Sequence, residues 1–374
     1  MYPNPGAYRL YLLYSGATSF FFALIFTVMG VYRVQEAGLN PLQLVLVGTA
    51  LEVTYFLFNV PTGVVADTYS RRLSVIIGVF LFSAGFVLEG LMPLFNVILL
   101  AQVIEAFAYT FVEGALEAWI VDEVGEENAG PVFLRGGQVG GIAGFVGIFA
   151  SVGFASLSLS LPIVLGGVLF GVLGVFLILA MREPAFHRPA RVQQRGVRER
   201  VTSALREMRG TIQGGASVIR RRPLALTILL IAAVFGGFSE GYDRLWEAHF
   251  LRNIGLPRIG AFDPVVWFGI ISAGSTLLGI GAAEVARRRI NTQNARDVVR
   301  ALLVFNTLLV IGVIGFAQAR GFGYALTAFW VSGTMRQLQY PVYGAWLNQN
   351  VDSRVRATVL SMSGQADALG QFSV

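Results

Sequence analysis

The sequence predicts an all-α integral membrane protein built from two related halves. Hydrophobic residues make up 55% of its 374 residues and charged residues only 13%, fractions that lie outside the range of soluble domains. Two similar charged segments, one ending at Arg72 and the other at Arg289, each follow an apolar stretch of membrane-spanning length. This repeated placement indicates that one arrangement of spans occurs twice.

Apolar segments of about 20 residues or more are long enough to cross a bilayer. We predict spans at residues 8–32, 41–66, 73–92, 95–121, 134–157, 161–181, 224–250, 263–285, 298–318, 322–347 and 356–374. The last segment is cut short at Val374, so we expect either a fragment or a chain without a final helix. The first segment is too long for a signal peptide and lacks a small-residue cleavage site, so it is expected to remain as the first span.

The placement of the arginines predicts the topology. All 28 basic residues are arginine; 22 fall in loops on one side of the predicted membrane and four on the other. By the positive-inside rule, the N-terminus and the central polar segment are cytoplasmic. The net charge of +6 is therefore a topology signal, and we expect the lipid bilayer, not nucleic acid, as the large partner.

The central polar segment, residues 182–223, separates two predicted domains. Residues 1–181 form a half with six helices, and residues 224–374 form a half with helices seven to ten and part of eleven. Within the segment, apolar residues recur at helical spacing from Val197 to Ile212, with arginines between them. This pattern favours an amphipathic helix on the anionic cytoplasmic leaflet, and a solvated linker is the alternative.

The seventh span carries four charged residues. A charge at a helix centre costs ~2.5–3.5 kcal/mol, so such residues face a partner or a water-filled cavity. The spacing i, i+3, i+4, i+7 places the four on one face: Glu240, Asp243, Arg244 and Glu247. Arg244 can neutralise Glu240 or Glu247, which leaves a carboxylate able to exchange protons. Glu240 and Asp243 are thus candidates for proton coupling or for an ion-pair lock on the outer gate; for Glu247 we favour the lock.

The fourth span places Glu105, Tyr109, Glu113 and Glu117 at successive i+4 steps, on one broad face. We expect Glu105 and Glu113 to lie deep in the membrane. Deep carboxylates suit protons or cationic substrates, so both are further candidates for proton coupling. The alternative is that they pair with arginines of neighbouring helices.

The tenth span presents a third polar stripe. Arg336, Gln339, Tyr340 and Tyr343 again follow the spacing i, i+3, i+4, i+7, and Pro341 is expected to kink the helix nearby. Arg336 is the expected partner of a carboxylate on the fourth or seventh span. Tyr109, Gln339, Tyr340 and Tyr343 are candidates for the substrate cavity, with Tyr14 and Thr18 of the first span as weaker ones.

The loop between the second and third spans carries the motif Gly63, Asp67, Arg71 and Arg72. With this motif as its most specific element, the chain resembles the major facilitator superfamily and, within it, the proton-driven drug-efflux members of bacteria. The segments Gly114–Glu127 and Ser239–Leu251 also carry the resemblance. The chain departs from the pattern at Thr68, where a basic residue is usual, and at Ser70, where glycine is usual. The glycine-proline antiporter signature of the fifth span is also not intact.

The resemblance implies two six-helix halves in a pseudo-twofold arrangement, with spans one, four, seven and ten facing one cavity. It also implies that Asp67 and the two arginines bridge to Asp122 at the end of span four and to the start of span eleven. That network would close the cytoplasmic mouth. A multi-pass protein of the bacterial cytoplasmic membrane, acting as a monomer, is the implied setting.

We therefore expect a secondary active transporter that exports small organic molecules in exchange for protons. The proton gradient supplies the energy, and no cofactor is expected. With no cysteine and two histidines, we expect no metal site. A symporter that imports a nutrient on the same fold is one alternative. An intramembrane enzyme is the other, although the sequence contains no HExxH, paired-aspartate or nucleophile-elbow motif.

Overall fold

The computed structural model describes residues 4–185, 202, 223–258, 265–350 and 353–373. Helices form the regular structure of these residues, and no strand occurs among them, which confirms the all-α prediction. Nine of the described helices are long and apolar enough to cross a membrane. The amphipathic helix predicted between Val197 and Ile212 lies outside the described residues.

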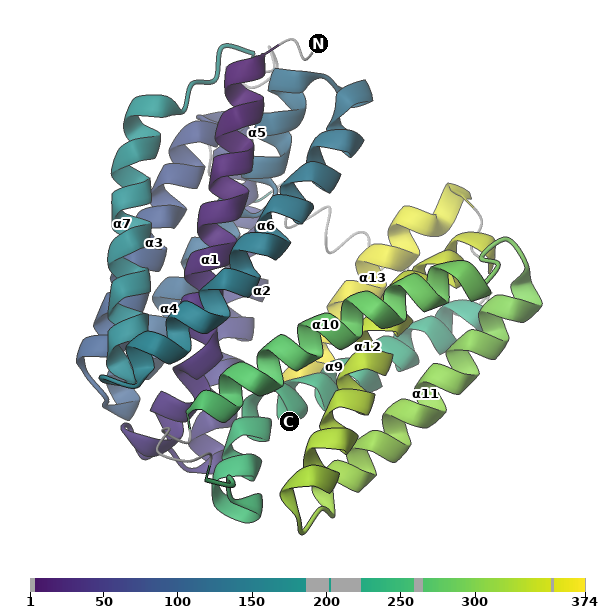
Figure 1. Cartoon of the computed structure of the whole chain (residues 1–374). Coiled ribbons are helices and arrows are strands. Elements are labelled where there is room, and N and C mark those ends of the chain that lie inside the picture. The colour runs from purple at the N-terminus through teal and green to yellow at the C-terminus, as the bar shows by residue number, and fades with distance from the viewer. Residues whose placement is uncertain (1–3, 186–201, 203–222, 259–264, 351–352, 374) are drawn as a thin grey trace. The chain divides into compact units, whose positions relative to one another are not determined.

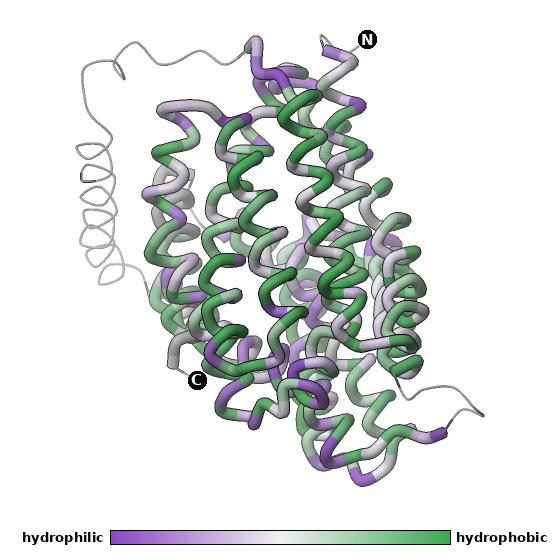
Figure 2. The backbone as a smooth tube through the Cα atoms, turned by 90° about the vertical axis from the view of Figure 1, so that its left-hand side faces the viewer, coloured by the Kyte–Doolittle hydropathy of each residue, from purple (hydrophilic) through white to green (hydrophobic). Residues whose placement is uncertain are grey.

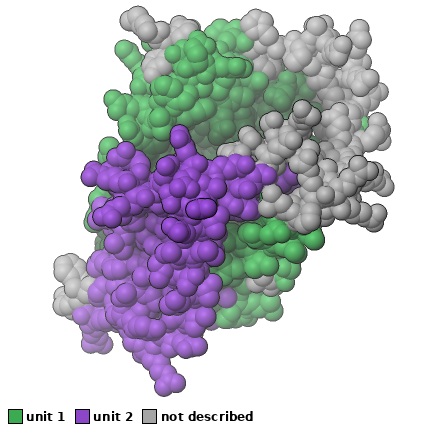
Figure 3. All heavy atoms as spheres, turned by 90° about the vertical axis from the view of Figure 1, so that its right-hand side faces the viewer, with its two compact units in different colours: residues 1–244, 366–374 green, residues 245–365 purple. Residues whose placement is uncertain are grey.

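The chain divides into two compact units (Figure 3): unit 1 contains residues 1–244 and 366–374, and unit 2 contains residues 245–365. The predicted division into halves at residues 182–223 stays a prediction.

Unit 1 is a bundle of helices that run side by side (Figure 1). Around α1, helices α6 and α7 pack; α3 packs on α4 and α7, and α2 packs on α4. The unit also contains the first part of α9 and the end of α13. The bounds are α1 Pro5–Gln35, α2 Pro41–Thr68, α3 Arg71–Leu91, α4 Phe95–Val112, α5 Ala115–Val124, α6 Glu126–Ala155, α7 Ser160–Ala180, α9 Pro223–His249 and α13 Ser353–Phe372.

Side-chain caps determine where several of these helices begin. Asn4 accepts a hydrogen bond from the backbone N–H of Ala7 at the start of α1 (3.1 Å). Asn40 and Gln43 form a reciprocal capping box at the start of α2. Helix α6 begins eight residues before the predicted span at 134, with two acidic residues in its first turn. The helix dipole favours acidic residues there, so this helix continues beyond its apolar part.

The predicted span at 95–121 falls within one candidate span, Phe95–Val124, but the helix is broken inside it. Helix α4 ends at Val112, Glu113 takes an extended conformation, and Gly114 has a φ of 73° before α5 begins. Residues with a Cβ atom rarely adopt a positive φ, so a glycine at position 114 is where the helix can break. The break interrupts the predicted stripe between Glu113 and Glu117.

The helices of unit 1 are largely hydrophobic along their length, and hydrophilic residues are concentrated at helix ends and loops (Figure 2). Large apolar side chains are widely exposed, among them Leu179 (76%) and Ile142 (72%). A soluble protein rarely exposes apolar surface on this scale, whereas lipid covers it at no cost. The exposed apolar surface therefore supports a membrane-embedded chain.

Unit 2 contains the rest of α9, a π-helical turn η2 (Phe250–Ile254), α10 (Val266–Arg289), α11 (Ala295–Ala317), α12 (Phe322–Asn350) and the start of α13. Helix α12 packs on α10 and α11 around a core of Val298, Phe305, Leu338 and Val342. Helices α12 and α13 lie where the last two spans are predicted but are not among the nine apolar helices. In α12, Arg336 and three glutamines lower the hydropathy.

A pair of glycine substitutions tests the break in the fourth span. Gly114→Ala is expected to destabilise the protein by about 1–2 kcal/mol, because the left-handed conformation penalises a Cβ atom. Gly137→Ala, in α6, is the matched control, since a Cβ atom meets nothing within 4 Å at either position. In a helix, that change stabilises by roughly 0.5–1 kcal/mol. Thermal unfolding in detergent should therefore show opposite shifts, and a lowered melting temperature for both variants would contradict the backbone argument.

Candidate functional site

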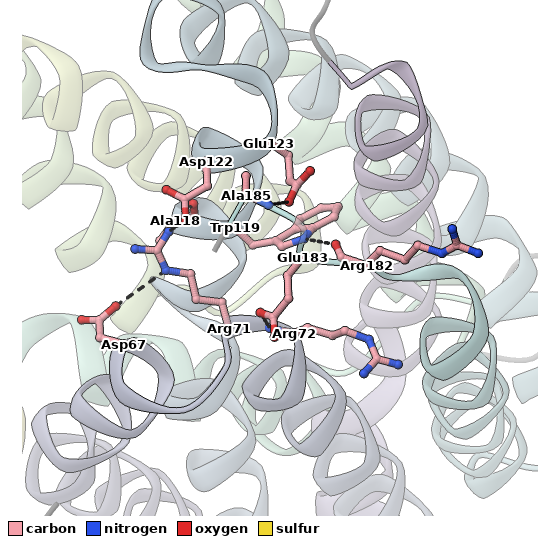
Figure 4. Close-up of polar contacts among 10 residues, drawn as sticks. All are labelled: Asp67, Arg71, Arg72, Ala118, Trp119, Asp122, Glu123, Arg182, Glu183 and Ala185. Atoms are coloured by element: carbon pink, nitrogen blue, oxygen red, sulfur yellow. Dashed lines mark hydrogen bonds and ion pairs between the residues drawn. The ribbon is translucent and has the colours of Figure 1, made fainter. Parts of the chain in front are cut away.

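A cluster of polar residues joins α2, α3, α5 and the segment after α7 at the end of unit 1 where α1 begins. Figure 4 shows it, and we call it the motif cluster: Asp67, Arg71, Arg72, Trp119, Asp122, Glu123, Arg182 and Glu183. Three of these residues belong to the loop motif that the sequence analysis singled out. The structure thus brings the motif together with residues distant in sequence.

Arg71 lies at the centre of this cluster. Its Nε is 3.7 Å from the Asp67 carboxylate one turn earlier, and its Nη1 pairs with the Asp122 carboxylate. The same Nη1 donates a hydrogen bond to the Ala118 carbonyl (2.8 Å). The contact expected between the loop motif and Asp122 is therefore present. Its role as a cytoplasmic gate, and the second bridge to the start of span eleven, stay predictions.

Arg72 and Glu183 cap two helices reciprocally. Arg72 donates to the carbonyls of Ile178 and Met181 at the C-terminus of α7, both at 2.6 Å. In return, Glu183 accepts hydrogen bonds from the Arg72 backbone N–H (3.0 Å) and the Ser70 hydroxyl at the N-terminus of α3. A cation at a helix C-terminus and an anion at an N-terminus are each favoured by the helix dipole.

Ser70 explains one departure from the family pattern. Its Oγ accepts a hydrogen bond from the backbone N–H of Leu73 (2.9 Å), so it is the N-cap of α3. The same hydroxyl donates to Glu183. A glycine, which is usual here, can make neither bond. Serine gives up the backbone freedom of a glycine, and its hydroxyl makes two hydrogen bonds instead. These bonds join the start of α3 to the segment after α7.

Two further contacts hold the segment after α7 against α5. The indole Nε1 of Trp119 donates to the carbonyl of Arg182 (2.8 Å). The Glu123 carboxylate accepts from the backbone N–H of Ala185 (3.2 Å) and from the Asn4 side chain (2.6 Å). The sequence analysis did not single out Glu123 or Glu183. Acidic residues are common at helix ends, so the sequence alone did not distinguish these two glutamates, which bind backbone N–H groups, from other acidic residues.

The seventh-span stripe is partly observed on α9. Glu240 is buried, and its carboxylate pairs with Arg244 at 2.8 Å, which is one of the two pairings that its spacing allowed. Gly48 of α2, in the same unit, makes room for this pair, because a Cβ atom there would overlap both charged groups. Glu52, one turn further along α2, is not among the candidate residues that the sequence analysis named. The roles of Asp243 and Glu247, and an approach of Arg336 to these carboxylates, stay predictions.

The fourth-span residues have different environments. Glu105 is buried, whereas Glu113 is exposed in unit 1 and accepts a hydrogen bond from the Tyr55 hydroxyl. The Tyr109 ring packs among aromatic side chains, stacked on Phe22 (6.0 Å) and edge-on to Phe82 (4.7 Å). Glu105 and Glu113 thus differ in burial within unit 1, and their depth in the membrane stays a prediction.

A second polar cluster, which we call the buried network, lies near the end of unit 1 where α1 ends. It consists of Arg33, Glu89, Gln102 and Glu105, each at most 6% exposed. Arg33 pairs with both oxygens of Glu89 at 2.7 and 3.0 Å. The sequence analysis assigned Arg33 to a loop and did not single out Glu89, because both lie at the ends of apolar segments.

The remaining cavity candidates divide by burial. Tyr14 and Thr18 are buried in unit 1, where the Thr18 hydroxyl donates to the Tyr14 carbonyl of its own helix (2.8 Å). In unit 2, Gln339 is buried, Tyr340 is 85% exposed, and Tyr343 stacks on Trp346 at 5.7 Å. The helix-internal bond of Thr18 uses its only donor, which favours a packing role for that residue.

The residues around Glu284 in α10 partly repeat the loop motif. Glu284 pairs with Arg288 at 2.6 Å, one turn later, as Asp67 does with Arg71. Glu284 also pairs with Arg287 at 2.7 Å. An acidic residue thus pairs with an arginine four positions later at the end of the predicted second span of each half.

This helical architecture, the loop motif and its partial repeat define a transporter of the facilitator fold. The Major Facilitator Superfamily matches residues 11–373, and the chain belongs to this family. The chain is 20% identical over 332 residues to the uncharacterized MFS-type transporter YxaM of Bacillus subtilis (strain 168), covering 88% of this chain and 78% of that protein.

Solved structures share the fold. The nucleoside transporter NupG superposes with a TM-score of 0.69 at 15% identity, covering 98% of this chain and 89% of the other. A bacterial homolog to the human lysosomal transporter Spinster gives a TM-score of 0.69 at 17% identity, covering 98% and 80%. A peptide transporter POT in complex with sulfate gives 0.68 at 12% identity, covering 99% and 87%.

Substitutions at Ser70 test the capping role in the motif cluster. Ser70→Ala is expected to lower the free energy of unfolding by about 1 kcal/mol, because α3 loses its N-cap, whereas Ser70→Gly costs only a few tenths for the cap itself. Thermal unfolding in detergent should rank the wild type above Ser70→Gly and that variant above Ser70→Ala. Ser156→Ala is the control, since that hydroxyl donates only within its own turn. Equal melting temperatures for Ser70→Ala and Ser156→Ala would rule out a capping role.

Proposed function

We propose that this transporter exports small organic molecules across the bacterial cytoplasmic membrane in exchange for protons. The observation that carries the proposal is the ion pair on α9 between the buried Glu240 and the partly buried Arg244, with Asp243 next to Arg244 in the sequence. These three residues contain two carboxyl groups and one guanidinium. A carboxyl group in such a stripe can accept a proton, and the one-turn spacing keeps it within reach of the arginine.

Protonation would act through the ion pair. When Glu240 is ionised, it attracts Arg244 with a charge-assisted hydrogen bond. A proton on Glu240 removes most of that attraction and frees the arginine for another carboxylate. Such an exchange of partners biases the protein between two arrangements, and rocking of the two halves around a midplane site then gives alternating access.

The motif cluster supports the same cycle. Arg71 is the residue through which α2, α3 and α5 are linked, because it contacts Asp67 and Asp122 together. We assign it the gate at the cytoplasmic mouth. The exposed Glu113 is a further acidic residue of the fourth span, and acidic groups favour cationic substrates.

Import by proton symport is the second candidate. The solved proteins with this fold include a nucleoside transporter and a peptide transporter by name, and the fold serves both directions of transport. The direction of proton movement separates the two candidates. Substrate entry into a liposome drives protons out in antiport and carries protons in by symport.

The proposal predicts proton movement linked to substrate in reconstituted liposomes. A pH-sensitive dye inside the liposomes should report alkalinisation on addition of an effective compound from a panel of cationic and zwitterionic molecules. Glu240→Gln and Asp243→Asn should each reduce this signal to the level of empty liposomes, because the carboxyl group that exchanges the proton is gone.

Glu36→Gln is the matched control, since Glu36 is an exposed carboxylate beyond the end of α1. It should retain the wild-type signal. Full proton-coupled transport by both the Glu240→Gln and the Asp243→Asn protein would refute this assignment of the coupling residues. Acidification of the liposome interior on substrate entry would support proton symport, and import would then replace export as the proposed function.

A further inference from the structure

The buried network contains two carboxyl groups and one guanidinium. Glu89 and Glu105 are 0% and 1% exposed, and Arg33 is 6% exposed. Arg33 makes a two-bond pair with Glu89 through its Nε and Nη2 atoms, the geometry in which an arginine neutralises a carboxylate best. The single positive charge of Arg33 is therefore matched by Glu89, and Glu105 brings a second carboxyl group to the same site.

Gln102 joins the two carboxyl groups. Its Nε2 donates to Glu105 Oε2 at 2.7 Å and to Glu89 Oε2 at 3.3 Å. The other oxygen of Glu105, Oε1, is buried and accepts no hydrogen bond from any described residue. An ionised carboxylate with one buried oxygen that accepts no hydrogen bond is unfavourable, whereas a protonated carboxyl group has no net charge to solvate.

The packing around Glu105 leaves little room for another partner. A Cβ atom on Gly85 of α3 would come within 2.6 Å of Glu105 Cγ. Glu105 is the eleventh residue of α4, which places it about 15 Å from the start of this helix at 1.5 Å per residue, within a candidate membrane span.

The other charged and titratable groups around this site do not restore the charge balance. Tyr32 of α1 donates its hydroxyl to the Glu89 carbonyl at 2.6 Å and so stays neutral. Tyr109 lies one turn further along α4. Arg244 of α9 also acts on Glu105 electrostatically, but its guanidinium pairs with Glu240.

We propose that Glu89 and Glu105 hold one proton between them at neutral pH, with Glu105 protonated while Arg33 pairs with Glu89. The proton makes the network neutral: one guanidinium, one carboxylate and one carboxylic acid. If Arg33 changes partner from Glu89 to Glu105, the same charge balance places the proton on Glu89. Only the use of this proton in transport rests on the function proposed above.

Infrared spectroscopy of the full chain in lipid tests the proton count, because a protonated carboxyl group has its own C=O stretching band. The wild type at neutral pH should show this band. Glu105→Gln should lose one carboxyl group's share of its intensity. Glu89→Gln should lose the same share, because Arg33 then pairs with Glu105 and the proton is no longer needed.

Substitutions at Arg33 test the same charge balance by removing or keeping the positive charge of the network. Arg33→Gln should add one carboxyl group's share to the band, because both glutamates must then be neutral. Arg33→Lys keeps the charge and should retain the wild-type intensity, and Glu36→Gln should also leave the band unchanged. Thermal unfolding in detergent checks that each variant is folded. The two glutamate variants are close in shape to the wild type and carry the test if Arg33→Gln does not fold.

Two results would overturn the shared proton. One is a Glu105→Gln spectrum identical to that of the wild type, which would mean that Glu105 is ionised. The other is a Glu89→Gln protein that keeps the full band, which would mean that the proton does not depend on the charge balance. Neither readout uses transport, so a failure of the export proposal leaves this measurement interpretable, and the reverse also holds.

Discussion

The bilayer interior offers no water to a charged side chain, and this constraint governs the polar residues of unit 1. Each buried charge needs an opposite charge or a proton. Arg33 meets the requirement with Glu89, and Glu240 meets it with Arg244. Glu105 is the buried acid whose second oxygen has no partner among the described residues. Two glycines follow from the same constraint, because a Cβ atom on Gly48 would overlap Glu240 and Arg244, and one on Gly85 would overlap Glu105.

The helix ends are governed by a related constraint. The last carbonyls and first N–H groups of a helix lack partners within it. In unit 1, Arg72 and Glu183 satisfy such groups on α7 and α3 at once. The loop motif is therefore a structural joint as well as a candidate gate. Its two arginines have separate tasks: Arg72 contacts backbone carbonyls of α7, and Arg71 contacts the carboxylates of α2 and α5.

The sequence predicted the class and the order of helices, because apolar length and arginine placement are local signals. The pairing of Arg71 with Asp122, 51 positions away, was implied only by the family resemblance. The sequence analysis missed the break at Gly114, since a glycine in an apolar segment can equally lie within a continuous helix. It also missed Glu89 and Glu183. Their partners, Arg33 and Arg72, lie 56 and 111 positions away in the chain, and no local spacing records such distances. The pairing of Glu240 with Arg244 was one of two that the spacing allowed, and packing against Gly48 is consistent with it.

The break between α4 and α5 separates the two polar clusters of unit 1. Glu105 of the buried network lies on α4, whereas Asp122 of the motif cluster lies on α5. A continuous helix would transmit a rotation at one end to the other through its hydrogen-bond ladder. With Glu113 extended and Gly114 at positive φ, that ladder is interrupted, so the shorter α5 can follow Arg71 while α4 keeps its packing. Helix α3, by contrast, runs unbroken from Arg71 to Leu91 and carries residues of both clusters. A change at the loop motif therefore reaches Glu89 through α3 more directly than it reaches Glu105 through α4.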